Sequence, residues 1–120
     1  DNYKIGNFIH TNIEDFKFKN KFDIIFSMET FYYFQTPYKV IKNIYNNLLL
    51  SKGILIIGID HYAENKQSLN WDKEYNLSTT TLSAADWESI FKKLNFKNIT
   101  INNYGKSDNW GGTLIIFAQK

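Results

Sequence analysis

The chain has 120 residues, 43% of them hydrophobic, which suffices for one globular core and not for two. A formal net charge of only +2, with Lys as the sole basic residue besides His, argues against a nucleic-acid partner. The chain has no Cys, only two His, no apolar run long enough to span a bilayer and no opening signal segment, so we expect a cytoplasmic protein without a metal site or a membrane partner.

The first elements along the chain are two candidate strands that end in polar residues. Asn7 to Thr11 predicts a short strand, which leads into Asn12-Ile13-Glu14. Phe22 to Phe26 is a β-branched and aromatic run that is typical of a buried strand, and it ends at the polar trio Ser27-Met28-Glu29.

A helix and a second strand are predicted next. Apolar residues recur at helical spacing from Tyr38 to Leu49, with Thr36-Pro37 as the start signal and Ser51-Lys52-Gly53 as the expected stop. Ile54 to Ile59 is apolar on both faces, as in a central parallel strand, and it runs into Asp60-His61-Tyr62. These residues together predict one βαβ unit.

The remainder predicts a second helix and a hairpin. After a polar stretch from Ala63 to Thr81, Ser83 and Asp86 match a capping box. The buried stripe of the helix that follows is Trp87, Ile90, Phe91 and Leu94. Lys97 to Asn103 alternates as a strand does, and Thr113 to Ala118 is a further strand, so the two are expected to pair antiparallel.

This order predicts an α/β fold: a partial, Rossmann-like, doubly wound sheet whose parallel strands are followed by a C-terminal antiparallel hairpin. Parallel sheets are found with helices on both faces, so a further βαβ unit is expected before Asn7. The first residue is Asp1 and not Met, which fits an excerpted or processed chain. We therefore expect residues 1–120 to be the C-terminal part of a single domain in a longer parent protein.

Candidate functional residues follow from the rule that open α/β sheets bind ligands beyond the carboxyl ends of their strands. The expected positions are those just after Thr11, Phe26 and Ile59, and all three are polar. Loops after strands are commonly polar for reasons of solubility alone. Three such exits on one edge of a sheet favour a binding site.

The run Phe22-Asp23-Ile24-Ile25-Phe26-Ser27-Met28-Glu29, followed by a helix, the segment Leu48 to Gly53 and a strand, is similar to the middle of small-molecule class I S-adenosylmethionine-dependent methyltransferases. The late hairpin also resembles the one that closes the sheet in that family. The resemblance implies S-adenosylmethionine as the cofactor and a small-molecule acceptor. It identifies the chain as part of a methyltransferase-like domain.

The same resemblance implies roles for individual residues. Asn12 takes the place of an acid that accepts from the adenine amino group, and the backbone amide of Ile13 would donate to the ring. The residues placed at the methionine end of the cofactor are Ser27, Met28 and Glu29, and the segment from Phe31 to Phe34 would wall the neighbouring pocket. An Asn carbonyl can still accept from an amine, with less charge assistance.

The chain departs from the family in its cofactor-binding features. It contains no glycine-rich loop of the G-x-G-x-x-G kind and no ribose-binding acid on a second strand. We therefore expect the chain alone to be inactive and to bind the cofactor poorly. The alternative function is a catalytically inactive methyltransferase-like module that acts through protein contacts.

We assign acceptor recognition and proton removal to His61 and Tyr62, because these residues follow the end of the most apolar strand, where ligands bind to open α/β sheets. His61 is the better base, since imidazoles titrate near neutral pH, and Asp60 or Glu64 could orient it. In the second interpretation, His61 only ends a strand and bonds a loop carbonyl.

The three tryptophans allow different roles. Trp87 is expected in the core. Trp71 and Trp110, in polar loops, are either pocket or lid residues or surface caps.

Overall fold

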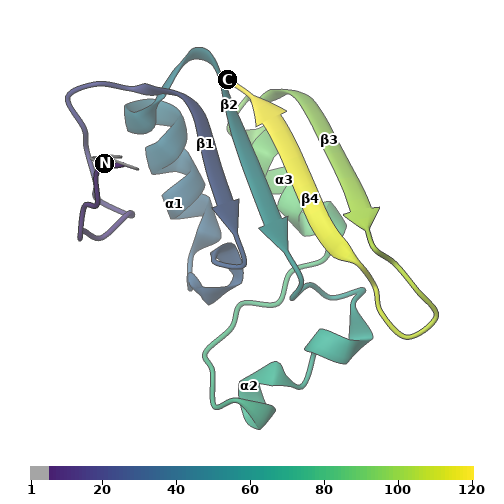
Figure 1. Ribbon diagram of the computed structural model, residues 1–120. Helices are drawn as coiled ribbons and strands as arrows, with labels where there is room; N and C mark the ends of the chain where they lie inside the picture. Colours follow the sequence, from purple (N-terminus) through teal and green to yellow (C-terminus); the bar gives the residue numbers. More distant parts are fainter. Residues whose placement is uncertain (1–5) are drawn as a thin grey trace, which may run out of the picture.

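The computed structural model describes residues 6–120 and contains a four-stranded sheet in the order β1-β2-β4-β3 (Figure 1). β1 (Phe22–Met28) and β2 (Leu49–Ile59) are parallel. β4 (Thr113–Gln119) is antiparallel to both β2 and β3 (Lys97–Tyr104). The predicted α/β class, the parallel pair and the terminal antiparallel hairpin are confirmed.

The first helix begins as predicted and ends earlier than predicted. α1 (Pro37–Asn43) has Thr36 at its N-cap and Pro37 in its first turn, and it continues as a π-helical stretch, η2 (Ile44–Leu48). The expected stop at residues 51–53 is wrong, because β2 already begins at Leu49.

The early end of this helix has a physical reason in a distant residue. Lys120 Nζ donates to the carbonyls of Tyr45 (2.5 Å) and Leu49 (3.2 Å), so a lysine caps the end of the helix where glycine was expected. Gly53 serves the strand instead: a Cβ there would lie 2.8 Å from the carbonyl oxygen of Leu50. This glycine allows a close backbone approach inside β2.

The second long helix confirms its sequence signals. α3 (Ala84–Lys93) starts with the predicted capping box, in which Ser83 Oγ accepts from the Asp86 amide (3.0 Å) and Asp86 Oδ2 accepts from the Ser83 amide (3.1 Å). Trp87 and Phe91 are fully buried on it, as the core interpretation of Trp87 expected. No helix within residues 6–120 is both long enough and apolar enough to cross a membrane.

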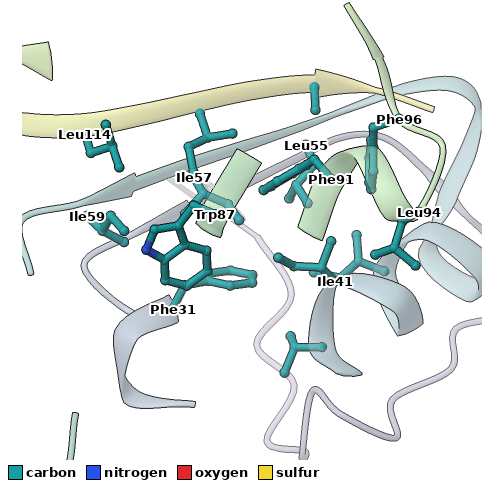
Figure 2. Packing of buried hydrophobic residues seen from close by; sticks show 14 of the residues in the cluster. Phe31, Ile41, Leu55, Ile57, Ile59, Trp87, Phe91, Leu94, Phe96 and Leu114 are labelled. Carbon is teal, nitrogen blue, oxygen red and sulfur yellow. The ribbon is translucent and has the colours of Figure 1, made fainter. Parts of the chain in front are cut away.

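The hydrophobic core lies between the sheet and the two helices α1 and α3 (Figures 1 and 2). Its central residues come from alternate positions of the strands and from one stripe of each helix: Val40, Ile41, Leu55, Ile57, Trp87, Phe91, Leu114 and Ile116. Alternation places the intervening strand residues on the opposite side of the sheet.

The opposite face of the sheet is apolar and uncovered within residues 6–120. Ile24 and Phe26 of β1 expose 60% and 62% of their surface there. They pair in register with Ile54 and Ile56 of β2, and Ile56 pairs with Phe117 of β4, so one apolar row runs across three strands. An apolar area of this kind marks a surface that packs against something else.

The predicted strand over residues 7–11 is wrong. These residues form no strand, and Phe8 is 97% exposed. A strand exists only through pairing with a neighbour, and the described part of the chain offers this segment no partner strand.

Candidate functional site

The exits of β1 and β2 lie side by side at one edge of the sheet. The Glu29 amide donates to the carbonyl of Gly58 (2.8 Å), so the pairing of the two strands continues into the loops. The connection from residue 63 to residue 82, which we call the 63–82 connection, lies beyond this edge and carries η3 (Lys66–Ser68) and α2 (Trp71–Glu74) (Figure 1). The polar exits after Phe26 and Ile59 therefore meet as predicted.

An apolar cavity of about 230 Å³ opens beside the exit of β1. The residues that line it are Ile13, Ile25, Phe26, Ser27, Thr30, Phe31, Phe34 and Ile44. Two of the predicted cofactor residues, Ile13 and Ser27, are thus brought together although they are far apart in the sequence. Phe31, which begins the 3-10 helix η1 (Phe31–Tyr33), and Phe34 also line this cavity.

Residues 12–16, which we call the 12–16 turn, contribute Ile13 to the lining of this cavity, whereas the predicted cofactor residue Asn12 does not line it. Asn12 Oδ1 accepts from the Glu14 amide (3.0 Å), and the Asn12 carbonyl accepts from the Asp15 amide (3.3 Å). Among residues 6–120 the Ile13 amide finds no hydrogen-bond acceptor. The turn therefore uses two of its amides internally and leaves the Ile13 N–H available to a ligand.

Met28 and Glu29 leave β1 in opposite directions. The Met28 side chain lies on the uncovered face, directly over Gly58, where a Cβ would collide with its sulfur. Glu29 adopts a left-handed backbone conformation with φ of 55°, which is uncommon for a residue other than glycine. Neither residue lines the apolar cavity.

Glu29 and Asp60 form a pair of carboxylates at the strand exits. Glu29 Oε2 accepts from the hydroxyl of Tyr32 (2.9 Å). Glu29 Oε1 and Asp60 Oδ1 are buried and have no hydrogen-bond partner within residues 6–120. Burial, and secondarily the charge of Asp60, raises the pKa of the Glu29 carboxyl. Buried acceptors without partners are rare, so this pair fits a polar or cationic ligand.

The raised pKa of the Glu29 carboxyl predicts the direction in which the stability of the fold changes with pH. A carboxyl that binds its proton more tightly in the folded state stabilises the fold below its unfolded pKa of about 4.3, and this stabilisation is lost as the pH rises through the folded pKa. Glu29→Gln should therefore raise the Tm near pH 7 and have a vanishing effect near pH 4, as thermal unfolding across this range would measure. Exposed Glu74→Gln is the control, and a Glu29→Gln effect that does not change with pH would contradict the assignment.

His61 is 1% exposed, and both its ring nitrogens have partners. Nδ1 donates to the carbonyl of Ser68 (2.9 Å), and Nε2 accepts from the hydroxyl of Thr81 (2.8 Å). The loop carbonyl of the second interpretation is thus present. The predicted orienting partners Asp60 and Glu64 are wrong, since neither contacts the imidazole.

Both errors have a geometric reason. The ring nitrogens of His61 are already bonded to Ser68 and Thr81, and the Asp60 carbonyl accepts from Asn65 Nδ2 (2.7 Å). Glu64 instead accepts from the Ala84 amide (3.1 Å) at the start of α3.

Tyr62 is buried beside His61 and bonds the base of the β3–β4 hairpin. Its hydroxyl has one hydrogen, which lies between the carbonyls of Gly111 (2.7 Å) and Gly112 (2.9 Å), and it accepts from Asn103 Nδ2 (2.6 Å). Burial raises the pKa of the Tyr62 hydroxyl. Neither His61 nor Tyr62 lines the apolar cavity, and their catalytic role stays a prediction.

The two loop tryptophans lie together over the strand exits. Trp71 and Trp110 stack with ring centroids 6.3 Å apart, and Trp71 also lies 6.1 Å from His61 and 6.2 Å from Tyr32. This arrangement covers the buried imidazole from the side of the 63–82 connection. It places both tryptophans in one aromatic cluster.

The contacts of two residues of this region were not predicted from the sequence. Tyr32, which lies in the predicted wall segment, is one, because its bond to Glu29 depends on the left-handed conformation of Glu29. Asn43 is the other: its Nδ2 donates to the carbonyls of Ile13 (2.9 Å) and Phe16 (2.8 Å) and so holds the 12–16 turn against α1. Its spacing of three residues from Val40, on the buried stripe, is the signal that could have found it.

Comparisons with known proteins address the family and the fold of the chain. Residues 2–106 match a family model described as a methyltransferase domain. The structure resembles a methyltransferase solved in complex with the Haloferax volcanii Trm112 methyltransferase activator (TM-score 0.72, 22% identity, 91% of this chain and 58% of that one). It also resembles a Thermotoga maritima S-adenosylmethionine-dependent methyltransferase, described as a possible histamine N-methyltransferase (TM-score 0.72, 18% identity, 92% and 62%).

A third structural relative is the Haemonchus contortus phosphoethanolamine N-methyltransferase 2, solved with phosphomonomethylethanolamine and S-adenosylhomocysteine (TM-score 0.71, 15% identity, 91% and 36%). No curated protein sequence matches the chain. The chain spans from about a third to three fifths of the length of these three structures. The family model and the Rossmann-like fold together show that the chain belongs to the methyltransferase domain family.

Proposed function

We propose that the parent protein transfers a methyl group from S-adenosylmethionine to a small-molecule acceptor, and that this chain supplies one side of the cofactor site. The observation that carries the proposal is the apolar cavity at the exit of β1, in which Ile13 and Ser27 meet. In a chain of the methyltransferase family, this cavity lies where ligands bind to open α/β sheets.

The adenine ring is the part of the cofactor that suits the cavity. Its flat apolar faces match the lining of Phe31, Phe34 and Ile13, and its ring nitrogens match the available Ile13 N–H. Asn12 Oδ1 already accepts from the Glu14 amide, and its second lone pair is left for the adenine amino group.

The methionine end of the cofactor suits the carboxylate pair. Its ammonium group would supply the hydrogen bonds that Glu29 Oε1 and Asp60 Oδ1 lack within residues 6–120. The bound cofactor brings the activated methyl group, and the residues of this chain hold it and orient it. Orientation alone removes several kcal/mol of a barrier of this kind, so the fold needs few further groups.

We assign the remaining contacts with the cofactor to other parts of the parent protein. The chain has no glycine-rich loop, and one face of its sheet is apolar and uncovered within residues 6–120. We propose that segments of the parent protein cover this face and supply the missing loop. The same uncovered face favours the second candidate function, an inactive module whose apolar face binds another protein.

Calorimetric titration with S-adenosylhomocysteine separates the two functions. The parent protein is expected to bind it, and residues 1–120 alone, checked for folding by circular dichroism, at least roughly a hundredfold more weakly. If the parent protein is folded and does not bind S-adenosylhomocysteine, the inactive interaction module remains as the candidate function. If residues 1–120 alone bind S-adenosylhomocysteine as tightly as the parent protein does, the assignment of the remaining cofactor contacts to other segments is wrong.

A further inference from the structure

The 12–16 turn keeps its internal shape through its own hydrogen bonds, and these bonds do not fix where it lies. The two bonds of Asn12 join residues of the turn to one another. The position of the turn relative to the cavity depends on the packing of Ile13 and Phe16 against the core and on polar contacts with α1. Two side chains of α1 make such polar contacts: Lys39 and Asn43.

Lys39 contributes the weaker contact. Its Nζ lies 3.2 Å from Glu14 Oε2, and the Lys39 side chain is 56% exposed. Exposed ion pairs of this kind contribute little to stability, and salt screens them. Lys39 therefore cannot hold the turn in a single position.

Asn43 makes the stronger contact because it is only 8% exposed and fully hydrogen-bonded. Both hydrogens of its Nδ2 are used, one on the Ile13 carbonyl (2.9 Å) and one on the Phe16 carbonyl (2.8 Å). Its Oδ1 accepts from Asn47 Nδ2 (2.7 Å), which fixes the orientation of the amide. Asn43 thus binds both ends of the turn from inside the protein.

We infer that Asn43 is a positioning residue for the cofactor: it sets the place of Ile13 at the rim of the apolar cavity without itself touching the ligand. The inference rests on the proposed function, because the cavity is assigned there to adenine. Fixing the Ile13 and Phe16 carbonyls on α1 directs the carbonyl side of the turn inward. Ile13, whose N–H has no acceptor within residues 6–120, is thereby held at the cavity that it lines.

No similar side chain can replace Asn43 at this position. Two carbonyls must receive hydrogen bonds from one nitrogen on a short side chain, and only an Asn amide of this length provides both donors. Asp has the same shape and offers only acceptors, which would face two carbonyl oxygens. Ser offers a single donor. Asn43→Asp is therefore the isosteric change that releases the turn, and Asn43→Ser the milder one.

The test is the dissociation constant of S-adenosylhomocysteine for the parent protein and its variants, measured at a temperature where all of them are folded. Asn43→Asp should raise the constant by roughly ten- to thirtyfold, and Asn43→Ser by less, since two hydrogen bonds hold the turn in the wild type. Hydrogen exchange at the amides of residues 13–16 should accelerate in both variants.

Two control variants separate positioning from stability. Val40→Ala creates a cavity in the same helix and destabilises the fold, and Lys39→Ala removes only the exposed ion pair to Glu14, which does not hold the turn. Both should bind S-adenosylhomocysteine nearly as the wild type does. If folded Asn43→Asp and Asn43→Ser bind as tightly as the wild type, or if Val40→Ala weakens binding equally, the inference is wrong. If the wild type itself does not bind, the proposed function fails as well.

Discussion

Replacing His61 by Ala is expected to lower the methyl-transfer rate of the parent protein by roughly 100-fold or more and to remove one limb of its pH profile, if His61 takes a proton from the acceptor. The proton would go to Nε2, because Nδ1 carries the hydrogen that bonds the Ser68 carbonyl. Nε2 now accepts from the Thr81 hydroxyl, so that hydroxyl must turn away before the transfer. Rates against pH, with cofactor affinity checked separately, are the measurement.

Thr81→Val is the matched variant for this test. It removes the hydroxyl that occupies Nε2 and leaves the imidazole and its bond to Ser68 in place. A general base at His61 would keep its pH limb in Thr81→Val and lose it in His61→Ala. An unaltered pH profile in His61→Ala would contradict the catalytic role, and His61 would then serve to fasten the 63–82 connection to the end of β2.

Ile24→Thr is expected to destabilise the parent protein by about 1.5–3 kcal/mol, the value of a fully buried Ile, and to leave residues 1–120 alone nearly unchanged. In the isolated chain the Ile24 side chain is 60% exposed on the uncovered face of the sheet, so little burial is lost there. Thr is also β-branched and keeps the strand preference of the position. The difference between the two chains, measured by urea unfolding, reports whether the parent protein covers this face.

Ile57→Thr on the same sheet provides the control. Ile57 is fully buried against α1 and α3, so this change should destabilise both chains. An Ile24→Thr variant of the parent protein that unfolds at the wild-type urea concentration would show that the face stays exposed. The inactive interaction module would then be the better description of the chain.

Most elements could be predicted from the sequence because their signals are local. The capping box of Ser83 and Asp86 marks the start of α3 within four residues, and the apolar run Ile54 to Ile59 identifies the centre of β2 by composition alone. The rule that ligands bind beyond the carboxyl ends of parallel strands then predicts a site at the edge where the exits of β1 and β2 lie side by side, and the location of the site stays a prediction.

The errors come from partners that are distant in the sequence or not in the chain. The end of the first helix was misplaced because Lys120, about 70 residues away, caps it. Residues 7–11 were predicted as a strand, yet pairing requires a neighbour that residues 6–120 do not contain.

The same distance effect limits prediction of the site. Asn43 acts on carbonyls 27 and 30 residues away, and the bonds of His61 to Ser68 and Thr81 depend on the path of the 63–82 connection. The spacing of Asn43 from Val40 places it on the buried stripe, but the bonding partners of Asn43 and of His61 cannot be read from the sequence, since both sets arise from tertiary packing.

The central claim is that the adenine ring of the cofactor binds in the apolar cavity at the exit of β1. NMR contacts between the ligand and the protein measure this location directly. S-adenosylhomocysteine would be added to the parent protein labelled on its Ile methyl groups, and nuclear Overhauser effects from the adenine protons recorded. We expect contacts with the methyl groups of Ile13 and Ile44, which line the cavity, and none with Ile99 on β3. Binding that gives no contact to Ile13, or contacts only to Ile54 and Ile115 on the uncovered face of the sheet, would contradict the proposed site.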